Sequence, residues 1–184
     1  MSILRRLSNT AIERKGRFRM DTRVERAFIG LGSNLGDGRA NLLAAWQRLG
    51  RVAGVRCLGL SSPYRTEPIG MTTAHWFTNA VGEVETGLAP HDLLAALLAI
   101  EAGMGRDRNL TADRPVDLDL LYYGARVLRT ESLSLPHPEI ANRLFVLAPL
   151  AELAPGHVHP LLKRTARQLC RELGQGQKVE KLKW

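Results

Sequence analysis

The chain has 184 residues, of which 45% are hydrophobic and 24% are charged. These values are ordinary for a soluble globular protein, and the length fits one domain with a substantial core. No apolar run approaches the ~20 residues needed to span a bilayer, so we expect no membrane partner. The two cysteines, Cys57 and Cys170, lack the spacing of a metal site, which favours a reducing compartment, the cytoplasm.

The net charge of +8 is divided unevenly along the chain. Residues 1–26 hold eight basic and three acidic residues, a net charge of +5, which leaves only +3 for residues 27–184. A nearly balanced body does not require a general polyanion-binding surface, so we expect no nucleic-acid partner.

The first 26 residues show little apolar periodicity and many arginines, which is typical of a mobile arm. A cleaved targeting peptide fits less well, because three acidic residues interrupt the segment and no apolar core with a small-residue cleavage site is present. Met20 is an alternative start of translation, and the sequence leaves these alternatives open. We therefore divide the chain into an arm, residues 1–26, and a single domain, residues 27–184, which we expect to be monomeric.

The first predicted elements are two strands with a helix between them. The strands are expected at 27–32 and at about 52–62, and the helix runs from its cap at Asp37 to Gly50. A glycine-rich turn precedes this helix, but it lacks the dinucleotide-binding spacing and the lysine of a P-loop, so alone it indicates only a tight turn. Two prolines and a glycine then predict a loop of set shape at 63–70.

The rest of the chain continues the alternation of helices and strands. We predict a strand at 77–86, a helix from Pro90 to about Met104, a mobile loop at 105–113, a strand ending at Tyr123, a hairpin through Gly124 to 127–128, and helices near 145–153 and 162–173. There are no internal repeats. The pattern predicts an α/β (α+β) sandwich with a partly antiparallel sheet.

The strand that ends at Tyr123 carries two carboxylates at a spacing of two residues. Asp117 and Asp119 therefore share one face, with Cα atoms roughly 6.6 Å apart. The other face carries Val116, Leu118 and Leu120. Two like charges this close are costly unless cations lie between them, and hard oxygen ligands suit Mg²⁺ together with substrate phosphates. The pattern predicts metal-assisted phosphate chemistry.

Several other residues have both a structural and a functional interpretation. Arg106, Arg108 and Arg114 flank the loop beside the carboxylates, where they form either a solvated charge run or phosphate ligands. Phe77 and Asn79 share a strand face, and a buried Asn79 must satisfy both its carbonyl and its amide, as a heterocyclic ring would do. Read singly, three further residues stay ambiguous: His137, Arg143 and Phe145.

Five segments in fixed order give these residues a common context. They are GLGSNLGD at 30–37, SSPYRTEP at 61–68, FTNAV at 77–81, GR at 105–106 with DRPVDLDLL at 113–121, and LPHPEIANRLF at 135–145. Together they resemble the 6-hydroxymethyl-7,8-dihydropterin pyrophosphokinase family of the folate pathway, over about residues 27 to 160. The resemblance implies a ferredoxin-like three-layer α-β-α sandwich with a mixed, mostly antiparallel sheet.

The resemblance also implies an activity and a set of site residues. Enzymes of this family transfer the terminal diphosphate of ATP to the pterin hydroxymethyl group and release AMP, with two Mg²⁺ ions. The implied metal ligands are Asp117 and Asp119, the implied catalytic arginines are Arg106 and Arg114, and the implied ATP contacts are Arg108, His137, Arg143 and Glu101. The implied pterin pocket consists of Thr66, Pro68, Ile69, Phe77, Asn79 and Phe145.

Two departures from the family pattern are visible. The loop from Gly105 to Arg114 is short and has Leu110 as its only apolar residue besides alanine, where some members place a sealing tryptophan. Ser132 stands where some members have an arginine that faces ATP. These changes concern closure over the site and ATP affinity rather than the chemistry.

Two rival functions remain at this stage. A non-catalytic, nucleic-acid-binding ferredoxin-like module would use the basic arm and tail, yet it requires exposed aromatic residues, and aromatics are only 5% of this chain. The other rival is a Mg²⁺-dependent phosphotransferase that uses the same pair of aspartates on a different alcohol.

Overall fold

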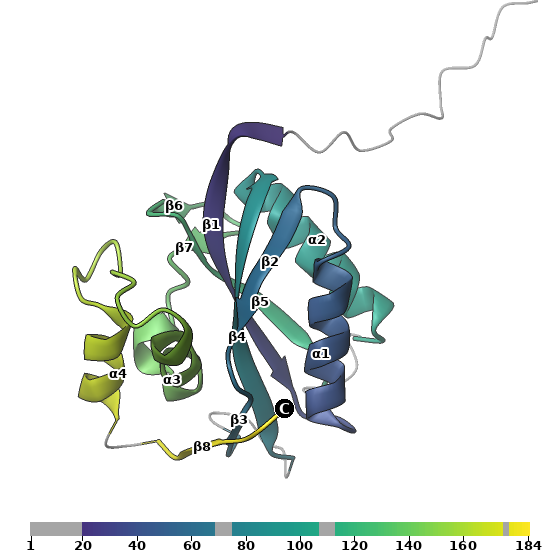
Figure 1. Ribbon diagram of the computed structural model, residues 1–184, viewed down its shortest axis with the longest axis vertical. Helices are drawn as coiled ribbons and strands as arrows, with labels where there is room; N and C mark the ends of the chain where they lie inside the picture. Colours follow the sequence, from purple (N-terminus) through teal and green to yellow (C-terminus); the bar gives the residue numbers. More distant parts are fainter. Residues whose placement is uncertain (1–19, 69–74, 107–112, 175–176) are drawn as a thin grey trace, which may run out of the picture.

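The structure is a computed structural model that describes residues 20–68, 75–106, 113–174 and 177–184 (Figure 1). Its strands are β1 (Met20–Ser33), β2 (Val55–Leu60), β3 (Tyr64–Thr66), β4 (Phe77–Leu88), β5 (Asp117–Tyr123), β6 (Leu128–Arg129), β7 (Ser134–Leu135) and β8 (Val179–Lys181). Its helices are α1 (Gly38–Leu49), α2 (Pro90–Gly103), the 3₁₀ helix η1 (Ile140–Asn142), α3 (Leu144–Leu153) and α4 (Ala166–Leu173).

The main sheet has six strands, in the order β5-β1-β4-β3-β8, with β2 also paired to β4. Each strand pair that the structure describes is antiparallel. β2 and β3 follow one another along the same edge of β4, so β1, α1, β2/β3, β4, α2 and β5 form the ferredoxin-like core. The predicted fold class is confirmed.

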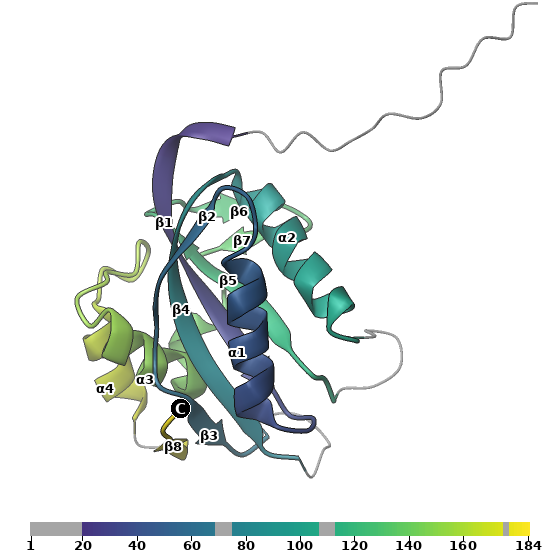
Figure 2. The same cartoon turned by 45° about the vertical axis from the view of Figure 1, so that its right-hand side comes forward.

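Helices cover both faces of this sheet and make three layers. In Figure 2 helices α1 and α2 lie side by side on one face, and in Figure 1 α3 and α4 lie on the other. Each face has its own buried cluster: Leu118 and Leu120 pack with α1 and α2, whereas Leu121 packs with α3. Because side chains alternate along β5, Asp117 and Asp119 fall on the α3 face, as the sequence predicted.

Local sequence explains where the two helices of the first layer begin and end. The Asp37 carboxylate caps α1 by accepting a hydrogen bond from the Ala40 N–H at 3.2 Å, and Gly50 follows the last helical residue. Pro90 begins α2, where its missing N–H costs nothing. Both helices were predicted within one residue at their ends.

Other boundaries differ from those predicted. β1 begins at Met20 rather than at residue 27, because its first residues continue along β4, with Met20 opposite Leu88. The loop predicted at 63–70 contains β3, which pairs with β4 despite Pro63 beside it. The predicted hairpin after β5 is wrong: β6 pairs with β7 instead, since Gly124 turns the chain away from the main sheet.

The C-terminal part also holds elements that the sequence pattern did not reveal. α4 begins at Ala166, not at residue 162, because Thr165 and Gln168 form a capping box there. β8 was not expected at all, since three residues are too few to show a strand period. Within the described ranges, no helix has the length and the apolar character needed to cross a membrane.

Candidate active site

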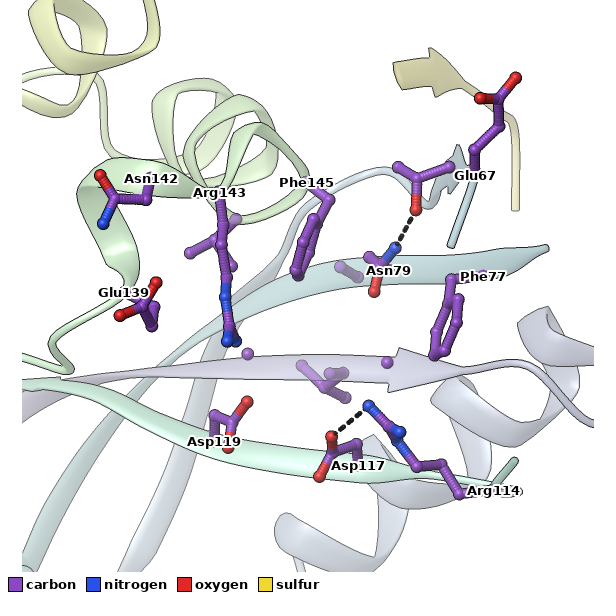
Figure 3. Close-up of a pocket in the computed structure, with 16 residues that line it drawn as sticks. Glu67, Phe77, Asn79, Arg114, Asp117, Asp119, Glu139, Asn142, Arg143 and Phe145 are labelled. Carbon is purple, nitrogen blue, oxygen red and sulfur yellow. Dashed lines mark hydrogen bonds and ion pairs between the residues drawn. The ribbon is translucent and has the colours of Figure 1, made fainter. Parts of the chain in front are cut away.

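A cavity of about 410 Å³ opens on the α3 face of the sheet (Figure 3). Strands β1, β3, β4 and β5 contribute residues to it, as do η1 and the start of α3. The lining includes Gly30, Gly32, Thr66, Glu67, Phe77, Asn79, Arg114, Asp117, Asp119, Glu139, Asn142, Arg143 and Phe145. Most of the residues singled out in the sequence therefore converge on one cavity.

Two glycines of β1 form the floor between the two sides of the cavity. Gly32 pairs with Asn79 on one side and with Asp117 on the other, while Gly30 pairs with Asp119. A Cβ atom on Gly32 would lie only 3.1 Å from Asn79 Oδ1. Of the predicted glycine-rich turn, only Gly36 has a positive φ, of 65°. The first two glycines instead keep the floor free of side chains.

The carboxylate of Asp117 is held between two arginines. Arg114 Nη2 lies 2.8 Å from Asp117 Oδ2, and Arg106 Nη1 forms an ion pair with Asp117 Oδ1. Asp117 retains 17% side-chain exposure, so its oxygens reach the cavity. These ion pairs offset the repulsion that two aspartates on one strand face would otherwise suffer.

The donor set suits a hard divalent cation that also binds phosphate. Among the residues that the structure describes, no three or more His, Cys, Asp and Glu side chains gather as a metal site. Two carboxylate side chains two residues apart, open to a cavity, are what Mg²⁺ uses when phosphates and waters complete its shell. Asp117 and Asp119 therefore fit Mg²⁺ and do not fit a fully protein-enclosed ion.

Glu101 lies behind β5 and is not part of the cavity lining. The residue is 1% exposed, and its Oε1 accepts hydrogen bonds from the Leu118 N–H at 2.7 Å and from Arg106 Nη1 at 2.8 Å. Its carboxylate thus connects α2 to β5 and orients Arg106. This geometry favours a positioning role over the ATP contact that the resemblance implied.

The other side of the cavity is built from aromatic rings and a buried amide. Figure 3 shows Phe77 and Phe145 on opposite sides of Asn79. Asn79 is 5% exposed, and its Nδ2 donates to Thr66 Oγ1 at 2.9 Å. The guanidinium of Arg114 lies 5.2 Å from the centre of the Phe77 ring, and that of Arg143 lies 5.7 Å from the Phe145 ring. Cations therefore border both rings.

His137 lies next to the carboxylate side without lining the cavity. Its Nδ1 accepts a hydrogen bond from the Glu139 N–H at 3.2 Å, which places the proton of the neutral ring on Nε2. Burial lowers the pKa of His137, and Arg143 lowers it further, while Asp119 and Glu139 act in the opposite direction. A neutral ring with an Nε2–H donor is suited to contact a phosphate oxygen.

The remaining predicted residues have different outcomes. Arg108 and Ile69 lie outside the described residues. Pro68 is half-buried beside the cavity, but it does not line it. Among the polar lining residues, the site residues named from the sequence do not include Glu67, Glu139 and Asn142. Glu139 and Asn142 reach the cavity through the 3₁₀ turn of η1, which is too short to be predicted from a periodic pattern in the sequence.

A protein-family model matches most of the chain. Residues 28–155 match the model described as 7,8-dihydro-6-hydroxymethylpterin-pyrophosphokinase (HPPK). The chain belongs to the HPPK family. The sequence resemblance is thereby confirmed over the body of the domain.

Curated relatives in the HPPK family carry the same activity in their names. A 2-amino-4-hydroxy-6-hydroxymethyldihydropteridine pyrophosphokinase of Methylorubrum extorquens is 45% identical over 133 residues, which cover 72% of this chain and 84% of the relative. The enzyme of that name from Bacillus subtilis is 41% identical over 128 residues, which cover 69% of this chain and 77% of the relative.

Solved structures support the fold of the HPPK family. The Plasmodium falciparum HPPK-DHPS with pteroate superposes with a TM-score of 0.69 at 14% identity. The match covers 85% of this chain and 46% of that longer chain. At this identity the likeness concerns the fold alone.

Proposed function

We propose that this chain transfers the terminal diphosphate of ATP to the hydroxymethyl group of 6-hydroxymethyl-7,8-dihydropterin, which gives AMP and the pterin diphosphate. The observation that carries the proposal is the composition of a single cavity. One side holds paired carboxylates with arginines, and the other holds two phenyl rings around a buried amide. A phosphate donor and a flat heterocyclic alcohol therefore fit side by side.

The ring side suits a pterin. Phe77 and Phe145 present flat apolar surfaces, and a ring between them would gain stacking and burial. Asn79 donates to Thr66, so its carbonyl oxygen remains oriented toward Gly32 and the cavity floor, where no side chain intervenes. A pterin edge alternates donors and acceptors, and it would satisfy this amide without leaving buried polar atoms unpaired.

The carboxylate side suits ATP with Mg²⁺. Asp117 and Asp119 would hold two ions, which supply charge neutralisation to the phosphates when bound. Arg114 lines the cavity beside Asp117 and would contact the same phosphates, whereas Arg106 lies against Asp117 and Glu101 without lining the cavity. Arg143 and the Nε2–H of His137 supply further donors on the side next to η1.

The residues then support an in-line displacement. The pterin hydroxyl oxygen forms a bond to the β-phosphorus as the bond from that phosphorus to the AMP oxygen breaks, and the hydroxyl proton passes to water. The rings fix the hydroxymethyl group, and the arginines stabilise charge that develops on the phosphoryl oxygens. Catalysis in this reaction class depends mainly on such positioning and electrostatics.

The rival functions use parts of the same geometry. A phosphotransferase acting on another alcohol would need the carboxylate side but not the pair of rings. A nucleic-acid module would need exposed stacking surfaces, whereas Phe77 is only 8% exposed. The ring side of the cavity therefore favours the pterin.

The test is AMP release from ATP and Mg²⁺ with and without 6-hydroxymethyl-7,8-dihydropterin. We expect AMP and pterin diphosphate in equal amounts only when the pterin is present. Other alcohols at equal concentration should give less than about one hundredth of that rate, since they lack the stacked ring. Glu172→Gln removes an exposed carboxylate of α4 that does not line the cavity, and it serves as a control with unchanged rate. AMP release at the same rate with and without the pterin would refute the proposal.

A further inference from the structure

The last eight residues of the chain connect two walls of the cavity. β8 pairs with β3, so that Val179 stands opposite Thr66 and Lys181 opposite Tyr64. Beyond β8, the Leu182 N–H donates to the Pro63 carbonyl at 2.8 Å. Figure 1 shows β8 running past the ends of α3 and α4 to the edge of the sheet at β3. The segment is therefore fixed to the wall that carries Thr66.

Gln177, two residues before β8, reaches the opposite wall. Its Oε1 accepts a hydrogen bond from the Leu144 N–H at 2.9 Å, and its Nε2 donates to the Asn142 carbonyl at 2.9 Å. The residue between these two partners is Arg143, which lines the cavity. Both ends of one side-chain amide thus hold the backbone on either side of a cavity arginine.

These bonds replace a cap that α3 lacks. Arg143 occupies the N-cap position without a side-chain capping bond, and the first turn of α3 has no acidic residue. The first N–H groups of a helix have no partner within the helix, so they need one from elsewhere. Gln177, 33 residues further along the chain, supplies it for Leu144. Arg143 and Phe145 enter the cavity from this same turn.

The other end of α3 has a separate attachment. Glu152 accepts hydrogen bonds from the Tyr64 hydroxyl at 2.7 Å and from the Ser62 N–H at 3.0 Å, and Lys181 Nζ lies 3.2 Å from its carboxylate. The helix as a whole is therefore held to β3 without Gln177. The bonds of Gln177 fix the position of the first turn of α3.

We propose that Gln177 is a positioning residue of the active site, which sets Arg143 and Phe145 against the wall formed by Thr66 and Asn79. The inference rests on the proposed function for its kinetic consequence. Gln177 does not line the cavity, and it acts through the backbone of residues 142–144. It lies two residues before β8, the strand that pairs with the wall carrying Thr66, so one short segment sets the spacing of both walls.

This role affects binding more than the chemical step. The turn at 142–144 positions the ring of Phe145, which would contact the pterin equally in the ground state and in the transition state, and the guanidinium of Arg143 lies 5.7 Å from the centre of that ring. Removal of such an interaction raises KM and leaves kcat nearly unchanged. A purely structural role of Gln177 would lower the thermal stability of the protein without a rise in KM at constant kcat.

The kinetic test compares three variants. Gln177→Ala should raise the KM for the pterin about five-fold, the equivalent of one lost capping bond, with kcat within about two-fold of the parent. Gln177→Glu keeps the acceptor for Leu144 and should recover part of the loss. Lys178→Ala changes the exposed neighbouring residue and should leave both constants unchanged. Equal KM values for the parent and Gln177→Ala, or a loss confined to kcat, would overturn the proposal.

A second measurement does not depend on the reaction. Amide hydrogen exchange at Leu144 should be about five-fold faster in Gln177→Ala than in Lys178→Ala, because the capping acceptor is lost. Unchanged exchange would overturn the role of Gln177 even if the enzyme were active. If the parent chain released no pterin-dependent AMP, the proposed function would fail, while the exchange rates and calorimetric pterin titration of the same variants would still decide the role of Gln177.

Discussion

The two sides of the cavity are built in different ways. The carboxylate side takes its main residues from β5 and the residues just before it, within a few positions of one another in the sequence. The ring side assembles Thr66, Asn79 and Phe145 from β3, β4 and α3, which are far apart in the chain. One side is local and charged, and the other is nonlocal and largely buried.

This difference separates two kinds of contribution to the reaction. Charges and their partners act on phosphate charge that changes during transfer, so their loss should lower kcat. Rings and the buried amide hold a heterocycle that does not change, so their loss should raise KM. Variants on the two sides should therefore give opposite kinetic signatures.

The largest effect is expected for the two aspartates. Asp119→Asn and Asp117→Asn should each lower pterin-dependent AMP formation about 10³-fold or more, because the phosphates lose their metal ligands. Steady-state rates at saturating substrates, together with circular dichroism to check the fold, measure this. Asp117 also holds Arg106 and Arg114, so its variant should lose thermal stability as well. Near-parent turnover in a folded Asp119→Asn protein would refute the metal assignment.

Arg114 should give the next largest effect, again on turnover. Arg114→Ala should lower kcat about 10²-fold and change either KM by less than about three-fold, since this guanidinium faces charge that develops during transfer. Arg129→Ala, on the exposed strand β6, is the matched control and should behave as the parent. A rise in KM with kcat retained would place Arg114 with the ring side, against whose Phe77 it also lies.

The same contrast explains what the sequence predicts well. The spacing of Asp117 and Asp119 fixes a shared strand face by local geometry, while the cap at Asp37 and the first-turn proline Pro90 locate α1 and α2. The ring side was reached through the family resemblance, because no local pattern brings Phe77 to Phe145. Glu139 and β8 were missed, since they depend on a 3₁₀ turn and on long-range pairing.

On the ring side, Phe145→Ala should raise KM with little change in kcat. We expect the KM for the pterin to rise about tenfold, the effect of one lost aromatic contact, while the KM for ATP changes less. Initial rates over a range of pterin concentrations measure both constants. Phe145 is only partly buried, so the variant should stay folded. A fall in kcat at unchanged KM would contradict the assignment of substrate binding to the ring side and of turnover to the carboxylate side.

The smallest effect concerns the layer that supports the ring side. His157 packs against Phe28 and Tyr122, with ring centres 4.7 and 4.4 Å away. Burial lowers the pKa of His157, and the neighbouring His159 lowers it further. The unfolded chain therefore takes up the proton first, so stability is unaffected above about pH 6.5 and decreases as the pH falls below it. Urea unfolding at pH 7.5 and 5.5 measures the decrease, and His157→Gln should reduce it, whereas His91→Gln, at an exposed position, should not. An equal decrease in all three proteins would show that other groups control acid stability and that the α3 layer has no special sensitivity.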